Sequence, residues 1–306
     1  MYGSSEYWEK IKAVAEQVAG SDAPILLIGE TGTGKEQMAK HIHDLSNRKM
    51  FVSVSCSVPD TLIESDLFGH VQGAFTGAIK TTKGKMEFAD NGTLLLDDVC
   101  DFSPNMQVKM LRVLQERTFT PVGSTDEKPL NARIISTSGK ELRNSSFRQD
   151  FFYRISAVTI KIPPLRERMP EIDGIIQHCI HVTNARYKKN IVGITDSVRA
   201  FFHNYDFPGN IRELQQMVDG ASLVCETERL HMEDIEKSTG WTEFVNTFKM
   251  DKLKDIEKEH ILHVLAKYRG NRTQTAEALG ICIRTLRIRL VEYRNDGSVF
   301  QDRIAI

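Results

Sequence analysis

The chain has 306 residues, of which 41% are hydrophobic and 26% charged, and its formal net charge at pH 7 is -1. This composition excludes a disordered or fibrous protein, and the balanced charge means that nucleic acid could be bound only by a local patch. No apolar run approaches the ~20 residues of a membrane span and no signal peptide begins the chain, so a cytoplasmic protein without membrane contact is expected. The five cysteines are scattered without a C-x-x-C pair, which predicts reduced thiols and no zinc site.

The first half of the chain alternates short apolar runs with helical sequence. Residues 5–19 carry apolar side chains at helical spacing and predict a helix. Buried strands are expected at residues 24–28, 51–56, 93–97, 132–137 and 157–162. This alternation is typical of an α/β fold, in which a largely parallel sheet is covered by helices on both faces.

A glycine-rich turn follows the first strand and leads into a helix that extends to about residue 45. The turn consists of Gly29, Glu30, Thr31, Gly32, Thr33, Gly34, Lys35 and Glu36. Glycines let backbone N–H groups surround phosphates, the helix N-terminus adds its positive end, and Lys35 can reach the β- and γ-phosphates. The alternative is a βα turn that binds nothing. Glu36 stands where most such loops place the hydroxyl that binds Mg²⁺.

Two acids end the strand at 93–97. Asp97 is placed to hold the Mg²⁺ that accompanies ATP, and Asp98 to polarise the attacking water. Taken alone, the pair could be an exposed strand end. Because it follows a phosphate-binding loop, a nucleotide site is favoured.

Helices replace strands in the second half. The pattern predicts an α/β nucleotide-binding subdomain at 1–168, a small all-α subdomain at 169–230, a linker without sustained periodicity at 231–250 and a helical module at 251–295. There are no internal repeats.

The C-terminal module is expected to contain helices at 252–268, 273–279 and 283–293, with Gly280 at the last turn. Residues 267–294 hold seven basic residues against two acidic ones. Such a basic helix after a helix and turn is typical of a helix-turn-helix that enters the major groove of DNA. The candidate DNA contacts are Arg272, Arg284, Thr285, Arg287 and Arg289. A solvated helical hairpin that mediates dimerisation is the alternative.

The hexapeptide Gly73, Ala74, Phe75, Thr76, Gly77 and Ala78 resembles the loop that defines bacterial sigma-54-dependent transcriptional activators. Other segments are similar as well. Residues 29–36 resemble that family's phosphate loop, which also ends in Glu, and 147–154 resemble the segment with two arginine fingers, Arg148 and Arg154. Residues 207–214 resemble its second sensor, with Arg212 at the nucleotide. The end of the chain resembles the Fis-type helix-turn-helix.

The resemblance implies a P-loop AAA+ parallel sheet, an α-helical lid at 169–230 and a three-helix DNA-binding module. It implies ATP and Mg²⁺ as cofactors, self-association into a ring, expected to be a hexamer, and enhancer DNA, sigma-54 and RNA polymerase as partners. ATP hydrolysis would remodel the closed promoter complex through the loop at Phe75 and Thr76. On pattern alone, Phe75 could instead be a buried anchor, and Arg148 and Arg154 a solvated basic face. Tyr2 to Ser5 resemble the motor's first residues, so no input domain is expected within this sequence. Control is expected from a separate regulatory protein, from the expression level or from a domain outside this sequence.

Four departures from the family pattern gather around the hydrolysis chemistry. Asp98 stands where Glu is usual, Ser55 where Asn is usual, and Ser138 and Gly139 where the first sensor has Thr and Asn; the loop at 143–146 is also short. These departures predict that the chain hydrolyses ATP slowly, or that it works best in a ring beside a subunit with the usual residues. Alternatively, paired changes such as those at Ser55 and Asp98 compensate for each other. The rival hypothesis is a DNA-bound regulator that binds ATP without hydrolysis and modulates another activator.

Overall fold

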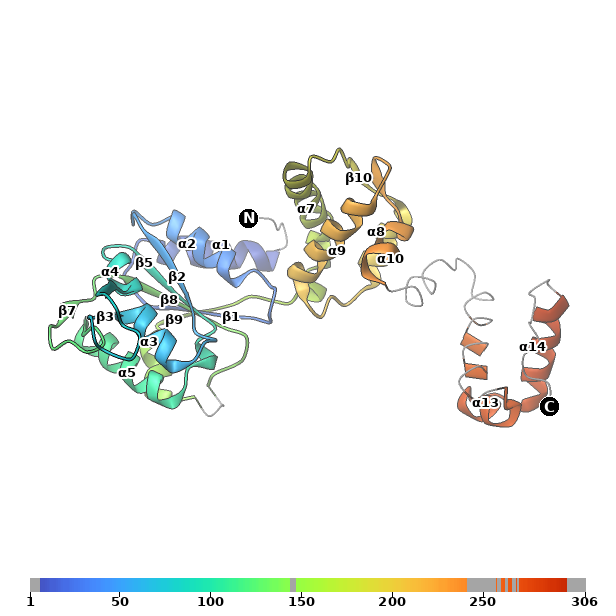
Figure 1. Cartoon of the computed structure of the whole chain (residues 1–306). Helices are drawn as coiled ribbons and strands as arrows, with labels where there is room; N and C mark the ends of the chain where they lie inside the picture. The colour runs from blue at the N-terminus through green and yellow to red at the C-terminus, as the bar shows by residue number, and fades with distance from the viewer. Residues whose placement is uncertain are drawn as a thin grey trace.

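The computed structural model describes residues 6–143, 147–240 and 270–295, together with residues 257, 260, 261, 264, 265 and 268. A five-stranded sheet with the order β2-β5-β8-β1-β9 forms the centre of the N-terminal part, residues 6–161, and every neighbouring pair in that sheet is parallel (Figure 1). The strands are β1 (Ile25–Ile28), β2 (Phe51–Ser55), β5 (Thr93–Asp97), β8 (Arg133–Ser138) and β9 (Val158–Lys161). The predicted parallel α/β sheet is thus confirmed.

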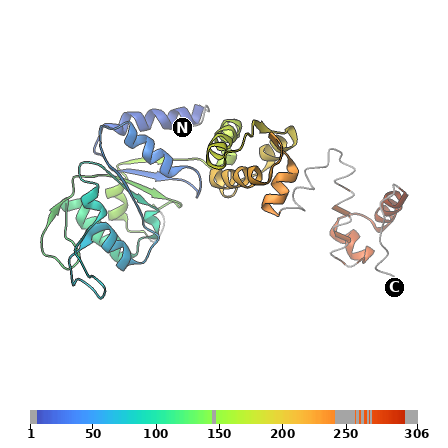
Figure 2. The same ribbon diagram turned by 45° about the horizontal axis from the view of Figure 1, so that its top comes forward.

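The three central strands are buried along nearly their whole length, whereas the edge strand β2 alternates buried and exposed residues. Helices on both faces explain the continuous apolar runs of the central strands (Figures 1 and 2). One face carries α1 (Glu6–Ala19) and α2 (Lys35–Asp44). The other carries α3 (Asp60–Phe68), α4 (Lys85–Phe88), α5 (Pro104–Glu116) and α6 (Gln149–Ile155), and the 3-10 turn η1 (Val99–Asp101) follows β5.

One arginine ties the centre of the sheet to the end of α1. Arg133 on β8 is 1% exposed, and its guanidinium donates hydrogen bonds to the carbonyls of Ala19 (2.6 Å) and Val18 (2.7 Å). These are last-turn carbonyls that have no partner within the helix, and a cation there also complements the helix dipole. Burial lowers the pKa of Arg133 to about 10. The group still remains charged at neutral pH.

Two small antiparallel hairpins extend from the side of the sheet that carries α3 and α5. In one, β3 (Gly69–His70) pairs with β4 (Thr82–Lys83), and in the other, β6 (Thr118–Phe119) pairs with β7 (Lys128–Pro129). A bridge between His70 and Val122 joins the two hairpins. The loop at 71–81 therefore projects from a braced base.

The lid has a hydrophobic core of its own. It is built from η2 (Leu165–Glu167), η3 (Met169–Glu171), α7 (Ile172–Tyr187), β10 (Gly193–Ile194), α8 (Asp196–Asn204), α9 (Asn210–Val224), β11 (Arg229–Leu230) and α10 (Met232–Thr239). In place of the linker expected from residue 231, α10 packs on α9 and buries Met232 and Ile235. The helix is short and only Met232 and Ile235 anchor it with apolar side chains, so the expected linker as a whole shows no sustained apolar repeat. Residues 241–250 lie outside the described part.

In the C-terminal region, α13 (Arg272–Ala278) and α14 (Ile283–Asn295) pack around Ile261, Ala276, Leu286 and Tyr293. Asn271 caps α13, since its side-chain oxygen accepts hydrogen bonds from the amides of Thr273 and Gln274. Most of the helix predicted at 252–268 lies outside the described residues. The five cysteines are free thiols, and no helix in the described ranges is long and apolar enough to span a membrane.

Candidate functional site

The phosphate-binding loop leaves the end of β1 and continues into α2. Gly32 and Gly34 have φ of 80° and 98°, in the left-handed region that favours glycine. A side chain at Gly32 would also meet the carbonyl oxygen of Gly209 in the lid at 2.2 Å. Glycine is therefore required at Gly32 for backbone conformation and for the close approach of the lid.

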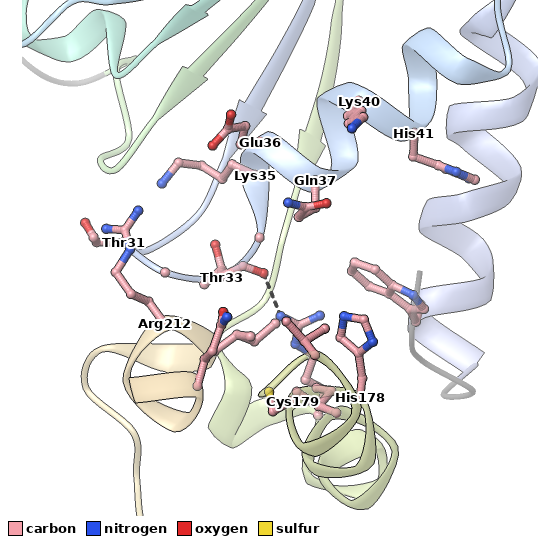
Figure 3. A pocket seen from close by; sticks show the side chains of 18 of the residues that line it. Thr31, Thr33, Lys35, Glu36, Gln37, Lys40, His41, His178, Cys179 and Arg212 are labelled. Atoms are coloured by element: carbon pink, nitrogen blue, oxygen red, sulfur yellow. Dashed lines mark hydrogen bonds between the residues drawn. The ribbon is translucent and has the colours of Figure 1, made fainter. Parts of the chain in front are cut away.

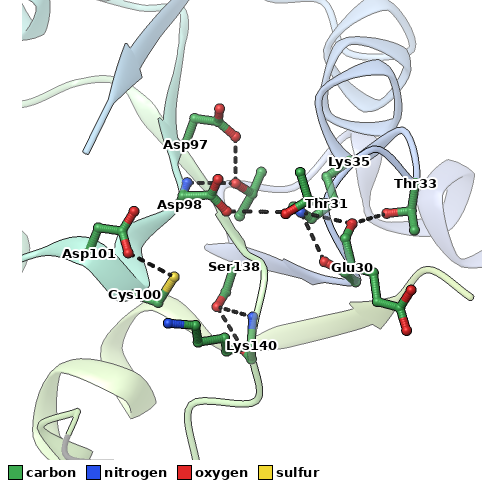
Figure 4. A network of polar contacts seen from close by, with 12 residues as sticks. Glu30, Thr31, Thr33, Lys35, Asp97, Asp98, Cys100, Asp101, Ser138 and Lys140 are labelled. Atoms are coloured by element: carbon green, nitrogen blue, oxygen red, sulfur yellow. Dashed lines mark hydrogen bonds and ion pairs between the residues drawn. The ribbon is translucent and has the colours of Figure 1, made fainter. Parts of the chain in front are cut away.

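Lys35 is buried with its ammonium inside the loop. The Nζ atom donates hydrogen bonds to the carbonyls of Gly29 (2.9 Å) and Glu30 (3.2 Å), and it lies 3.9 Å from Oδ1 of Asp98 (Figure 4). The charge thus sits between the loop backbone and the acids at the end of β5. This is the position from which a lysine reaches the β- and γ-phosphates of a nucleotide.

Thr137, which the motif analysis did not single out, holds the acid pair together. Its Oγ1 donates to Oδ1 of Asp97 (2.6 Å) and accepts from the backbone N–H of Asp98 (2.8 Å). This contact follows from strand register, because Leu96 lies opposite Ser136 and the next residues of β5 and β8 are then neighbours. Asp98 adopts φ of 56°, which turns the chain sharply after Asp97.

Asp98 points into a partly buried space beside Lys35. Burial raises the pKa of its carboxyl and the acids Asp97 and Asp101 add to that rise, whereas the Lys35 charge and the Gly139 amide oppose it. Oδ1 of Asp98 is buried and has no hydrogen-bond partner among the described groups. A carboxylate held in this way is a stronger base than an ordinary aspartate.

The predicted sensor residues lie next to this space without filling it. The Ser138 hydroxyl donates to the carbonyl of Lys140 (2.6 Å), so it faces its own turn (Figure 4). A Cβ at Gly139 would lie 3.8 Å from both Oδ1 of Asp98 and Oγ1 of Thr31. Ser55 lies opposite Asp97 in the sheet, and its hydroxyl accepts a hydrogen bond from the Ser57 amide. No described hydrogen bond joins Ser55 to Asp98.

The lid is clamped to the phosphate loop through Glu30. Its carboxylate accepts two hydrogen bonds from the guanidinium of Arg166 (2.6 and 2.8 Å) and a third from Asn210 Nδ2 (3.2 Å). Bonding to Arg166, and then to Asn210, lowers the pKa of Glu30 to about 2. The backbone N–H of Ile211 also donates to the carbonyl of Gly32 (3.0 Å). The clamp places the neighbouring Arg212 over the loop.

A cavity of about 730 Å³ opens between this loop and the lid (Figure 3). The predicted residues that line it are Thr31, Gly32, Thr33, Gly34, Lys35, Glu36, Asp97, Asp98 and Arg212. Gly29 and Glu30 do not line the cavity. The Gly29 carbonyl accepts a hydrogen bond from Lys35, and the Glu30 carboxylate belongs to the clamp with Arg166. In Figure 3 the side chain of Arg212 approaches Thr31, and those of His178 and Cys179 rise from the lid helix α7.

The cavity is also lined by side chains that the motifs did not indicate. Trp8 of α1, Ile175 and Val182 are apolar, whereas Lys40, His41 and His178 are polar. The guanidinium of Arg168 lies 4.8 Å from the centre of the Trp8 ring and donates to the carbonyl of Thr33 (2.7 Å). The cavity thus offers cationic side chains for phosphates and an aromatic ring for a nucleotide base.

The two candidate finger arginines lie outside this cavity, on or beside α6. Arg148 is paired with Asp150 (2.7 Å) on the surface. The guanidinium of Arg154 donates twice to the carbonyl of Leu114, at 2.7 and 3.1 Å, near the end of α5. Neither arginine lines the cavity of its own chain.

The loop at Gly73–Ala78 forms a compact turn at the tip of the β3-β4 hairpin. It is closed by a hydrogen bond from the Gly73 amide to the Ala78 carbonyl (3.0 Å). Phe75 is 46% exposed and stands edge-on to the ring of His70, with 5.0 Å between ring centres. Ile79 beside it is 84% exposed and was not singled out by sequence. Phe75 is therefore a surface side chain and not a buried anchor.

The predicted DNA contacts of the C-terminal helices fall into two groups. Arg272, Arg284, Thr285 and Arg287 are exposed. Arg289 is instead half-buried and paired with Glu257 and Glu292, each at 3.1 Å. Arg289 thus joins α14 to another segment of the module, which pattern alone did not indicate.

Comparisons with known proteins cover almost the whole chain. Residues 1–161 match the sigma-54 interaction domain family, 166–243 an AAA+ ATPase lid domain, and 252–293 the Fis family of bacterial regulatory proteins. The transcriptional regulatory protein ZraR of Salmonella typhimurium is 37% identical over 299 residues, which are 95% of this chain and 68% of ZraR. FlbD of Caulobacter vibrioides is 35% identical over 314 residues, 94% of this chain and 69% of FlbD. The crystal structure of NtrX from Brucella abortus in complex with ATP superposes with a TM-score of 0.71 at 26% identity, and covers 95% of this chain and 68% of NtrX.

Proposed function

The chain belongs to the sigma-54-dependent transcriptional activators that carry an AAA+ nucleotide-binding domain and a Fis-type helix-turn-helix, and on that premise we propose that it hydrolyses ATP to remodel the closed sigma-54 RNA polymerase complex. One observation carries this proposal. The Lys35 ammonium lies inside the phosphate loop and faces Asp98, with the lid clamped over the same loop. Lys35, Asp98 and residues of the lid thus line one cavity, which supports this proposal.

In this proposal the phosphates of ATP occupy the loop from Gly29 to Glu36, and the adenine base lies beside Trp8. Lys35 and Arg212 would contact the phosphates from the two sides of the cavity. Asp97 would hold Mg²⁺, whose role when bound is to neutralise phosphate charge. The donor set fits Mg²⁺, which usually binds one or two carboxylates together with substrate phosphates.

Hydrolysis would begin with a water between Asp98 and the γ-phosphate. As the water oxygen bonds to phosphorus and the bond to ADP breaks, Asp98 would take up the water proton. The raised pKa of Asp98 favours proton acceptance, and the rate should fall as acidification protonates this carboxyl. The step requires a second subunit if Arg148 and Arg154 are to stabilise the transition state, since both lie outside their own cavity. A ring, which we propose to be a hexamer, provides that neighbour.

The non-hydrolysing regulator is the second candidate function, and Gly139 favours it. The space between Asp98 and Thr31 that a longer side chain could occupy is left open. Such a chain would bind ATP and act on DNA as a co-subunit of another activator. A phosphate-release assay at high protein concentration, with Lys35→Ala as the blank, separates the two. Release above the blank supports the enzyme, and release equal to the blank supports the regulator.

The substitution Asp98→Glu is expected to increase ATP turnover by about tenfold, which is part of the ~100-fold that a 1 Å misplacement can cost. The extra methylene extends the carboxylate toward the γ-phosphate through the space beside Gly139. Adding Gly139→Asn fills the same space with a polar group, so the two effects should be non-additive in a double-mutant cycle. Steady-state turnover at saturating ATP is the measurement.

A matched control is Asp101→Glu, which lengthens an exposed acid of the adjacent 3-10 turn that is hydrogen-bonded to Ser57. Its turnover should stay at the parent value. If Asp98→Glu is no faster than the parent, the site is already adapted to aspartate and turnover is not slowed by its reach.

The double substitution Arg284→Ala with Arg287→Ala is expected to weaken DNA binding and to flatten its salt dependence. Each lost phosphate contact lowers the slope of log K against log salt by about 0.9, so the pair should lower it by nearly 2. Affinity is measured by titration of duplex DNA at four salt concentrations. Arg289→Ala is the contrast, because Arg289 is already paired with Glu257 and Glu292. Equal slope changes for Arg289→Ala and the pair would contradict this division of roles.

A further inference from the structure

The outward face of α14 combines cations with two large apolar side chains. Arg284, Arg287, Ile288 and Val291 recur at three- and four-residue spacing, which places them on one side of the helix. The orientation is settled by the opposite side, where Leu286 is fully buried in the core of the C-terminal helices. Ile288 is 52% and Val291 is 59% exposed. The apolar pair is therefore not required to fill that core.

Single exposed aliphatic side chains are common on protein surfaces and need no partner. Here two of them lie one helical turn apart, and two exposed arginines, Arg284 and Arg287, lie on the same face. A protein partner would have to cover both apolar groups and also satisfy both guanidinium groups. Duplex DNA can contact both kinds of side chain at once. Its phosphates at the groove edges bind the guanidinium groups, and an apolar group on the groove floor can cover the aliphatic side chains.

That apolar group is the C5-methyl of thymine, which only A·T pairs display in the major groove. We propose that Ile288, supported by Val291, contacts thymine methyl groups and makes the chain prefer sites with thymine at the contacted position. Isoleucine has no hydrogen-bonding group, so its discrimination depends on the methyl alone. Arg284 and Arg287 provide phosphate or guanine contacts around it. The inference rests on DNA binding by the C-terminal helices and is independent of ATP hydrolysis.

Replacing thymine by deoxyuridine tests this contact, because deoxyuridine lacks only the methyl group. The full chain first selects its preferred duplexes from a randomised pool, and each thymine of the best site is then replaced in turn. At one or two positions we expect the parent to lose about fourfold in affinity, the value of one buried methyl. Ile288→Ala should bind the thymine site as weakly as the parent binds the deoxyuridine site, with no further loss on deoxyuridine.

Arg284→Ala is the matched control, since it should weaken both duplexes equally and keep the methyl sensitivity. Circular dichroism and thermal melting verify that Ile288→Ala is folded. The proposal is overturned if every thymine can be replaced without loss, or if Ile288→Ala keeps the full methyl sensitivity. A changed oligomeric state of Ile288→Ala with unchanged DNA affinity also overturns it, in favour of a subunit contact. Failure to bind any duplex would reject DNA binding itself, and a normal phosphate-release rate would show that the ATPase proposal survives.

Discussion

Replacing Lys35 by alanine is expected to reduce the affinity for ATP by about a hundredfold or more. The ammonium lies inside the phosphate loop, held by the carbonyls of Gly29 and Glu30. Charge-assisted hydrogen bonds contribute about 1.5–3 kcal/mol each, so loss of two of them to phosphate oxygens corresponds to two or more powers of ten. Isothermal titration with ATP and with a non-hydrolysable analogue measures the loss directly.

Lys49→Ala is a suitable control, because Lys49 is an exposed lysine that does not line the cavity. It should bind ATP as the parent does. Lys35→Met retains the buried hydrocarbon and keeps the test meaningful if the alanine variant is unstable. Parent-like affinity in a folded Lys35→Met protein would mean that the cavity between loop and lid is not the ATP site.

Alanine at Phe75 or Thr76 is expected to abolish open-complex formation while ATP turnover stays within about twofold of the parent. The loop is braced on the β3-β4 hairpin, and neither residue lines the nucleotide cavity. An exposed aromatic ring at the tip of a braced loop has the character of a binding hot spot, where truncation costs about 2 kcal/mol or more. That cost predicts a loss of at least about thirtyfold in heparin-resistant complexes at a sigma-54 promoter.

Phe88→Ala provides the matched control, since Phe88 on α4 is another half-exposed phenylalanine, at 53%. Promoter opening by this variant should equal that of the parent. If Phe75→Ala and Thr76→Ala both open the promoter normally, the loop is not the element that contacts sigma-54. A parallel loss of ATP turnover would instead indicate that the loop supports the fold of the motor.

The sheet was predictable from sequence because each of its strands is a short buried run. β5 coincides with the predicted strand, and the other four differ by one residue at one or both ends. Strands that are covered on both faces show continuous apolar sequence with sharp limits, such as the glycine after Ile28 and the acids after Leu96. The phosphate loop was predictable for a related reason, since its chemistry is local in the chain.

The missed features depend on contacts between distant segments. Thr137 reaches Asp97 only because β8 and β5 are neighbours in the sheet. Trp8 and Arg168 meet because α1 and the start of the lid approach the same loop from two sides. The spacing of residues within one segment cannot predict contacts between segments that are distant in the sequence. The ion pair of Arg289 with Glu257 is another such contact, because Glu257 lies on another segment, and the DNA contact of Arg289 stays a prediction.

The strand order has a consequence for the sequence of events during synthesis. β1, which carries the phosphate loop, is flanked by β8 and β9, so its two neighbours leave the ribosome more than 100 residues after it. Pairings this far apart must close long loops before they gain stability, whereas the lid helices pack on near neighbours in the chain. A nascent chain that stops before Val158 still has one unpaired edge on β1. The phosphate loop lies early in the sequence, but the strands that flank β1 are synthesised late. This loop is thus among the last parts of the nucleotide-binding domain to gain its full surroundings.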